Sequence, residues 1–229
     1  MTTHVLDIAD LKKSFISPDG ESNLVVDVPR FSLTEGEQIA LQGSSGSGKT
    51  TFLNLIAGIL KPDSGRITLA GHTLSGLSEP QRDRVRANML GYVFQTFNLL
   101  QGYTALENVM LGMMFGPGAN SSHARQLLER VGLKERMHYR PRQLSVGQQQ
   151  RVAVARALAN YPKLVLADEP TGNLDHRNGK EALSLIREVC SENGAALLLV
   201  SHDREVLGRF EKVHELTSIN KAAVEESKK

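Results

Sequence analysis

The sequence is short of three things: cysteine, net charge and long apolar runs. Cys190 is the only cysteine among 229 residues, so the chain can form neither an internal disulfide nor a thiolate metal site. This usage is typical of a reducing compartment. Because Cys190 falls within an expected helix over residues 178–193, we predict that it packs in the core as a small apolar side chain.

The shortage of apolar runs disfavours a membrane-spanning protein, and the near-neutral charge gives no support to a nucleic-acid-binding one. The longest apolar run, residues 195–200, is far below the ~20 residues that a membrane-crossing helix needs. Residues 1–10 show no basic stretch followed by an apolar segment, so no signal peptide is expected. Lysine and arginine total 27 against 25 aspartates and glutamates, and this balance argues against nucleic acid as a partner.

The length allows one large α/β domain, or one such domain with an inserted lobe. Two complete nucleotide-binding domains would not fit. Small and charged residues dominate the last segment, and we expect residues 218–229 to form a flexible tail.

The most informative segment runs from Gly43 to Thr50 and reads GSSGSGKT, which matches the phosphate-loop pattern GxxxxGK[ST] at every fixed position. Small residues let successive backbone N–H groups curl around a polyphosphate, Lys49 adds a point charge, and the Thr50 hydroxyl can take one Mg²⁺ position. A buried strand is expected over residues 37–42 and a helix over residues 50–60, which disfavours a flexible Ser/Gly linker. The predicted nucleotide contacts are Gly43, Ser44, Ser45, Gly46, Ser47, Gly48, Lys49, Thr50 and Thr51.

Three more apolar runs are expected to be buried parallel strands, and each ends in a polar group. Residues 164–167 lead into Asp168 and Glu169, residues 195–200 into Ser201 and His202, and residues 91–94 into Gln95. Open α/β sheets bind ligands at the carboxyl ends of their strands. The polar groups should therefore meet at one edge and form an ATP and Mg²⁺ site.

Asp168 and Glu169 should have different tasks, because consecutive side chains that leave a strand point in opposite directions. We predict that Asp168 holds Mg²⁺ and that Glu169 polarises the attacking water near the γ-phosphate. The alternative, two solvated turn acids, is disfavoured because adjacent carboxylates at the end of an apolar strand are costly without a cation.

Residues 144–151, LSVGQQQR, lie just ahead of the strand that ends in Asp168. With the phosphate loop, this segment resembles the signature sequence of the nucleotide-binding subunits of ABC transporters. The resemblance implies that Gln95 is the Q-loop glutamine near the metal, that residues 173–175 form the D-loop, and that His202 contacts the γ-phosphate. It also implies that one chain completes the ATP site of a second chain through Ser145, Gly147 and Gln148.

The same resemblance implies the architecture of an α/β P-loop NTPase. A RecA-like core with an antiparallel β subdomain would comprise residues 1–95 and 161–217, and a helical subdomain would comprise residues 96–160. Thr104 begins a capping box that should open one helix of that lobe, and residues 121–131 and 147–160 should form two others. Phe15 stands where the family stacks an aromatic ring on adenine, although it could equally be a core residue.

By the same resemblance the protein should work as a homodimer across two ATP molecules. An integral membrane permease subunit should hold it at the cytoplasmic face of the membrane. The segments PTGNLD (170–175) and TALENV (104–109) are similar to the group that serves lipoprotein release, macrolide and peptide efflux, and cell division. A soluble, non-transport ABC ATPase such as a cofactor-assembly scaffold remains the alternative.

Two features need the structure to decide them. Val146 stands where the family usually has glycine, and because a β-branched residue resists positive φ we expect Val146 at negative φ. An apolar group after Gln95 could dock the membrane partner or could simply pack the helical lobe; it comprises Phe97, Leu99, Leu100, Met110, Met113, Met114 and Phe115.

Overall fold

The computed structural model describes residues 4–44 and 46–222. The strands are β1 (His4–Ile16), β2 (Ser22–Thr34), β3 (Gln38–Gln42), β4 (Ser64–Leu69), β5 (His72–Thr73), β6 (Leu90–Val93), β7 (Leu164–Asp168), β8 (Ala196–Ser201) and β9 (Lys212–Glu215). The α-helices are α1 (Lys49–Ile56), α2 (Glu79–Met89), α3 (Ala105–Met114), α4 (Ser121–Arg130), α5 (Val146–Ala157), α6 (His176–Glu192), α7 (Arg204–Leu207) and α8 (Leu216–Ile219).

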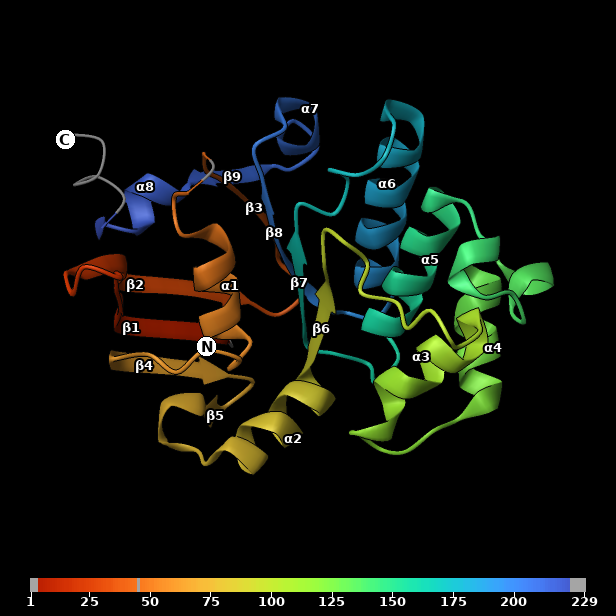
Figure 1. The fold of residues 1–229 in the computed structure, drawn as a ribbon, viewed down its shortest axis with the longest axis horizontal. Coiled ribbons are helices and arrows are strands. Elements are labelled where there is room, and N and C mark those ends of the chain that lie inside the picture. Colours follow the sequence, from red (N-terminus) through yellow and green to blue (C-terminus); the bar gives the residue numbers. More distant parts are fainter. Residues whose placement is uncertain (1–3, 45, 223–229) are drawn as a thin grey trace.

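The strands form two sheets, and helices α3 to α6 lie on the far side of the second sheet from the first (Figure 1). The first sheet is antiparallel with the order β2-β1-β4-β5, and the second is parallel with the order β6-β7-β8-β3-β9. This is the predicted combination of a P-loop core with an antiparallel β subdomain near the N-terminus.

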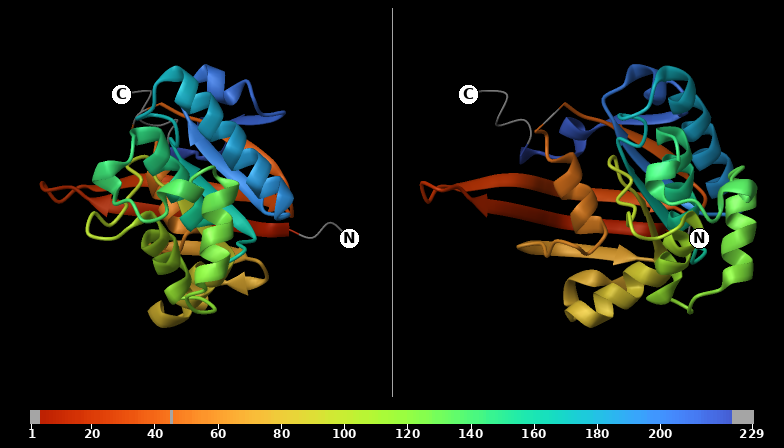
Figure 2. Two further views of the ribbon diagram at one scale, coloured as in Figure 1. Left: turned by 90° about the vertical axis from the view of Figure 1, so that its right-hand side faces the viewer. Right: turned by 45° about the vertical axis from the view of Figure 1, so that its right-hand side comes forward.

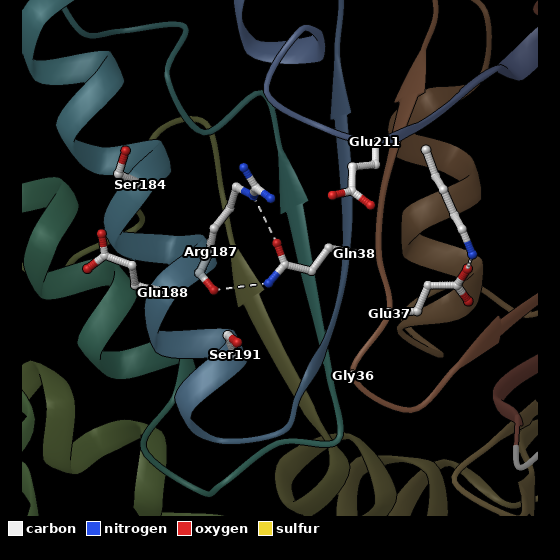
Figure 3. Close-up of a pocket in the computed structure, with 9 residues that line it drawn as sticks. Gly36, Glu37, Gln38, Ser184, Arg187, Glu188, Ser191 and Glu211 are labelled. Atoms are coloured by element: carbon white, nitrogen blue, oxygen red, sulfur yellow. Dashed lines mark hydrogen bonds and ion pairs between the residues drawn. The ribbon is translucent and has the colours of Figure 1, made fainter.

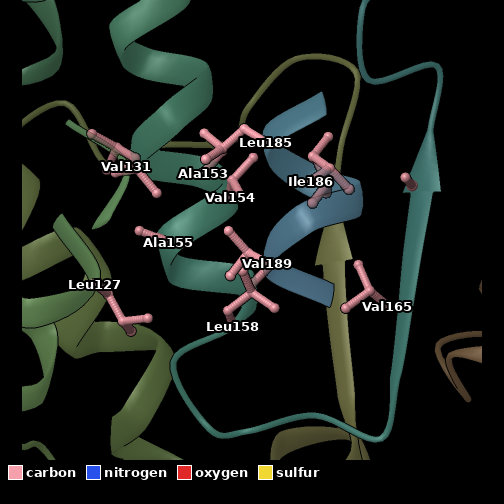
Figure 4. Packing of buried hydrophobic residues seen from close by; sticks show 14 of the residues in the cluster. Leu127, Val131, Ala153, Val154, Ala155, Leu158, Val165, Leu185, Ile186 and Val189 are labelled. Atoms are coloured by element: carbon pink, nitrogen blue, oxygen red, sulfur yellow. The ribbon is translucent and has the colours of Figure 1, made fainter. Parts of the chain in front are cut away.

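The central parallel strands β7 and β8 are buried on both faces, which explains why they read as continuous apolar runs, whereas the edge strand β9 is exposed. In β8, Leu197 and Leu199 pack into a core shared with α5 and α6. Leu198 and Val200 point the other way, into a core shared with α1 and the antiparallel sheet. Figure 4 shows the first of these cores, where side chains of α5 and α6 meet Val165 of β7.

Helices α3, α4 and α5 all fall within residues 96–160 and pack against one another (Figure 2). Thr104 caps α3 as predicted: its Oγ1 accepts from the Glu107 N–H at 3.2 Å, and the Glu107 carboxylate accepts from the Thr104 N–H at 2.7 Å. The partly buried Arg156 of α5 donates to the carbonyls of Phe97 and Asn98 at 2.6 Å each. The lobe is thereby tied to the segment that follows β6. The division of the chain at residues 95 and 161 remains a prediction.

The structure differs from the sequence-based expectation at the end of the first helix and in the C-terminal segment. The first helix stops at Ile56 rather than at residue 60, because Gly58 adopts a left-handed conformation with φ 66°. The expected flexible tail is wrong for residues 218–222, since α8 and the fully buried Asn220 pack against β2 there. Residues 223–229 lie outside the described part of the chain. Cys190 is fully buried, as predicted, and burial raises its thiol pKa to about 12.

Candidate ATP site

The phosphate loop lies between the end of β3 and the start of α1, as the sequence predicts. Gly48 caps the helix at φ 86°, a conformation that glycine adopts without strain. A Cβ atom at Gly43 would lie only 2.7 Å from Ser47 Oγ, so a side chain at this position would displace the Ser47 hydroxyl. Ser47 Oγ donates to the Ser44 carbonyl at 2.8 Å. Ser45, one of the predicted contacts, lies outside the described residues.

Lys49 extends over the loop, and its ammonium group donates to the carbonyls of Gly43 at 2.9 Å and Ser44 at 2.8 Å. The same Nζ lies 3.7 Å from Glu169 Oε1, and both side chains are about nine-tenths buried. The charge of Lys49 is therefore held at the place where the β- and γ-phosphates would enter.

Asp168 ends β7 beside the first turn of α1. Thr50 Oγ1 donates to Asp168 Oδ2 at 2.9 Å, so a hydroxyl and a carboxylate meet side by side. Burial raises the pKa of Asp168, and the negative charge of Glu169 adds to the effect, although the Thr50 hydrogen bond and Lys49 oppose it. These oxygen donors suit a hard divalent cation, which would also compensate the buried charge.

Glu169 adopts φ 44°, in the left-handed region that non-glycine residues seldom occupy. Its N–H donates to the Val200 carbonyl at 3.0 Å, and its own carbonyl accepts from Gly172 N at 3.0 Å. This tight turn directs the carboxylate toward the end of β8. There Glu169 Oε2 accepts from Ser201 Oγ at 3.0 Å, and Oε1 lies 2.7 Å from His202 Nδ1.

The sequence places Ser201 at the end of a strand beside His202 but predicts no contact for its hydroxyl. Its hydroxyl is fully buried, donates to Glu169 and accepts from the Asp203 N–H at 3.1 Å. The available signal was its position as the last residue of β8, next to His202. His202 itself is mostly exposed, with 69% of its side chain accessible.

Gln95 completes the edge of the sheet beyond β6. Its carbonyl accepts from Asn173 Nδ2 at 2.7 Å, and its side-chain amide lies beside Gly172. One cavity of about 530 Å³ joins this residue to the phosphate loop and the acidic pair. Its lining consists of Val25, Ser44, Gly46, Gly48, Lys49, Thr50, Thr51, Gln95, Asp168, Glu169 and His202. Side chains from strands far apart in sequence thus meet at one edge, as predicted.

The signature residues are not part of this cavity. Ser145 caps α5 and bonds reciprocally with Gln148: the Gln148 N–H donates to Ser145 Oγ at 3.3 Å, and the Ser145 N–H donates to Gln148 Oε1 at 3.0 Å. A Cβ atom at Gly147 would lie 2.9 Å from Asn178 Oδ1 of α6. Val146 is the first residue of α5, is about half exposed, and is absent from the residues with positive φ, which confirms the expectation for its backbone.

Phe15 also lies apart from the cavity lining. It stands near the end of β1, is 41% exposed, and has Lys13 Nζ 5.6 Å from its ring centroid. It is therefore not a core residue. Stacking on adenine remains a prediction, which an exposed ring on this strand allows.

The apolar group after Gln95 divides into two parts. Phe97, Leu99 and Met113 are buried in the helical lobe, and Met110 packs against the same core. Leu100, Met114 and Phe115 are exposed, Phe115 to 78%. Phe115 borders a groove of about 760 Å³ between α2, β6, α3 and α5, which Ile59, Tyr92 and Phe94 also line.

A different hollow, of about 540 Å³, opens at the other end of the parallel sheet (Figure 3). Arg187 there donates to Gln38 Oε1 at 2.9 Å and to the Arg209 carbonyl at 2.6 Å. Lys212 pairs with Glu37 at 2.5 Å. Unlike the cavity beside Lys49, this hollow is lined neither by the phosphate loop nor by Asp168 and Glu169.

No helix within residues 4–44 and 46–222 is both long and apolar enough to span a bilayer.

Known proteins resemble the chain along most of its length. It is 42% identical over 212 residues to the lipoprotein-releasing system ATP-binding protein LolD of Pseudomonas syringae pv. tomato, covering 91% of this chain and 93% of that protein. Identity to the protein of the same name from Shewanella oneidensis is also 42%, with 91% of both chains covered.

Solved structures of ATP-binding cassettes also resemble the chain. The dimeric ATP-binding cassette MJ0796, in a post-hydrolysis state bound to ADP and Pi, superposes with a TM-score of 0.83 at 34% identity and covers 92% of this chain and 93% of its own. A second dimeric structure of MJ0796, described as a bacterial ABC transporter cassette, gives 0.82 with the same coverage. Residues 26–172 match the profile of the family described as ABC transporter. The chain therefore belongs to the ABC transporter family, as an ATP-binding and ATP-hydrolysing cassette.

Proposed function

We propose that this protein hydrolyses Mg²⁺–ATP to drive a membrane complex of the lipoprotein-release type. The observation that carries the site is the connected set at the sheet edge, in which Thr50 bonds to Asp168 and Glu169 contacts Lys49, Ser201 and His202. The identity to the two LolD proteins supports the release type.

Each residue of this set has a chemical task. Backbone N–H groups of the phosphate loop and the Lys49 ammonium bind the β- and γ-phosphates. Thr50, Asp168 and Gln95 are the oxygen donors that would hold Mg²⁺, which supplies charge neutralisation at the phosphates when bound. Glu169 orients the attacking water and accepts its proton, while His202 donates a hydrogen bond to the γ-phosphate.

The signature residues act in a second copy of the chain. Ser145 and the start of α5 are exposed and lie outside the cavity of their own chain. The capping box uses the N–H groups of Ser145 and Gln148, so the N–H groups of Val146 and Gly147 in the first turn of α5 are the ones offered to a phosphate held by a partner. The two dimeric structures of the similar cassette MJ0796 support this arrangement. ATP bound at both sites would then hold the homodimer together.

The membrane partner docks in the groove beside Phe115. Tyr92 and Phe94 line this groove at the end of β6, directly before Gln95. A helix seated there would touch the same segment that carries Gln95 into the ATP site. The protein would in this way be held at the cytoplasmic face of the membrane.

A test uses the tagged chain expressed with its membrane subunits. Phe115→Asp should lose co-purification from detergent-solubilised membranes and keep the ATPase rate of the isolated chain, because the groove lies outside the ATP cavity. Ile16→Asp is the matched control, since Ile16 is 80% exposed against 78% for Phe115 but stands at the tip of the β1–β2 hairpin. An isolated wild-type chain without ATPase activity would contradict the proposed chemistry, and equal retention of both variants on the membrane subunits would contradict the docking site.

A further inference from the structure

The segment after β9 makes a contact that the ATP site does not explain. Asn220 lies just beyond α8, is fully buried, and uses its side-chain amide on the backbone of β2. Its Oδ1 accepts from the Asp27 N–H at 2.7 Å, and its Nδ2 donates to the Val25 carbonyl at 2.9 Å. The next residue, Lys221, donates its N–H to the Asp27 carbonyl at 2.8 Å.

These bonds fall on an edge strand. β2 is the outermost strand of the antiparallel sheet, so one side of its backbone has no strand neighbour in the described sheet. Asn220 and Lys221 satisfy three backbone groups on that free side. Because α8 follows β9 directly, the same short segment links the edges of the two sheets (Figure 1).

The link also reaches the phosphate loop. The Val25 carbonyl would lie 2.9 Å from a Cβ atom at Gly48, and Asn220 Nδ2 would lie 3.5 Å from it. Val25 is one of the residues that line the ATP cavity. The backbone of β2 is therefore held against the last glycine of the loop, with the Asn220 amide fixing it from outside.

On its other side, β2 pairs with β1, and β1 carries Phe15, the predicted adenine contact. β1 pairs with β2 so that Phe15 lies opposite Asn23, two residues before Val25. Any movement of β2 at Val25 would shift Phe15 relative to Gly48. The distance between a base stacked on Phe15 and phosphates held in the loop thus depends on where β2 is anchored.

We infer that Asn220 is a positioning residue for ATP, which sets the spacing between the base-binding strands and the phosphate loop. This inference rests on the proposed ATP site. It requires a nucleotide that touches both parts at once, whereas a ligand that occupies the loop alone should be indifferent to Asn220.

The experiment compares ATP with inorganic tripolyphosphate, which has the phosphates but no base, by calorimetry on the full chain. Asn220→Leu, similar in size but without hydrogen-bonding groups, should weaken ATP binding about tenfold. Tripolyphosphate binding should change less than about twofold. The KM for ATP should rise by the same factor as the Kd, with little change in kcat, because Asn220 touches no reacting group.

The control is Ser218→Ala, which removes a hydrogen bond from Ser218 Oγ to the Glu215 carbonyl within the same segment. It should alter neither affinity. If Asn220→Leu does not fold, Asn220→Ala replaces it, since water can then reach the freed groups of β2. Unchanged ATP affinity, or equal losses for ATP and tripolyphosphate, would overturn the inference. A wild-type chain that binds neither ligand would instead overturn the proposed function.

Discussion

At the carboxyl edge of the parallel sheet, the ATP-site side chains come from several elements and contact one another. At the start of α5, the signature residues contact only neighbours within the same helical turn. Lys49, Glu169 and His202 form a continuous set of contacts across three segments. We call these three residues, the phosphate loop and Asp168 the phosphate half of the site. Residues 145–148, the signature half, bond within one helical turn and face outward.

The difference indicates what each half needs in order to function. The phosphate half buries two carboxylates, Asp168 and Glu169, against the one ammonium group of Lys49, so a bound cation would compensate the remaining negative charge. The signature half has satisfied caps and no buried charge, so it gains a function only from a second chain. Substitutions in the first should change binding or chemistry, and substitutions in the second should change assembly.

The largest effect is expected for Lys49→Ala. The backbone loop alone cannot replace a charge held against two phosphates, so ATP turnover should fall more than about 10³-fold. Steady-state ATPase assays with the folded variant, verified by circular dichroism, measure this. A variant that retained wild-type turnover would refute the phosphate half.

Glu169→Gln should slow hydrolysis by roughly 10²–10³-fold while ATP stays bound, because the amide keeps the shape of the carboxylate but loses its basicity. Persisting ATP should stabilise the dimer. Light scattering should show mostly monomer without nucleotide and mostly dimer with ATP. A variant that remains monomeric in saturating ATP would remove the basis for treating the two halves as one site.

Ser145→Arg, added to Glu169→Gln, tests the signature half directly. Bulk and charge at the helix cap should weaken the ATP-dependent dimer by about 30-fold or more, and ATP binding to the monomer should change little. Dimer dissociation constants and ATP affinity measured on the same preparation separate the two effects. Equal losses of ATP affinity and dimer would mean that the halves are not distinct.

Asp168→Asn should raise the Tm of the nucleotide-free chain by a few degrees (~2–4 °C) while removing the dependence of ATP binding on Mg²⁺. Burial raises the pKa of Asp168, so its contribution to stability is present in acid and lost as pH rises through the folded pKa. The advantage of the variant should therefore grow from about pH 4 toward pH 7. Calorimetric scans across this pH range measure the difference in Tm between the variant and the wild type. A difference that became smaller toward pH 7 would contradict the expectation.

The smallest effect is expected for Val146→Gly. Since Val146 already has a helical backbone, glycine relieves no strain there, and the ATPase rate should change less than about twofold. A tenfold increase would show that the Val146 side chain obstructs dimer closure. The signature half would then limit dimer closure through the Val146 side chain.

Local signals were enough to predict much of this molecule. The phosphate loop has a fixed spacing, the Thr104 cap is a four-residue pattern, and apolar runs ending in Gln95 or His202 indicate buried strands whose carboxyl ends share an edge. Each of these depends on residues within one or two elements. They therefore predicted a parallel α/β sheet and most of the residues that meet in the cavity, although not Val25, while the P-loop NTPase architecture came from the family resemblance.

Other features depend on distant partners, and short patterns carry no signal for them. The left-handed backbone of Glu169 is held by the Val200 carbonyl from another strand. The role of Ser201 follows from where that turn directs the Glu169 carboxylate. Asn220 bonds to β2 across more than 190 residues, so a segment that reads as a loose end by composition is packed in place.

The strand order has a consequence for how the protein is made. β3, which leads into the phosphate loop, pairs only with β8 and β9 in the described sheet. Gln38 pairs with Leu197 and Ile39 with Lys212, both more than 150 residues later in the chain. On the ribosome the loop emerges early, yet its supporting strand has no neighbours until almost the whole chain has been synthesised. Such non-local pairing favours slow, late folding. ATP capture by a nascent chain would accordingly mark the completion of synthesis, and protein truncated before β8 should depend on chaperones rather than on nucleotide for protection from aggregation.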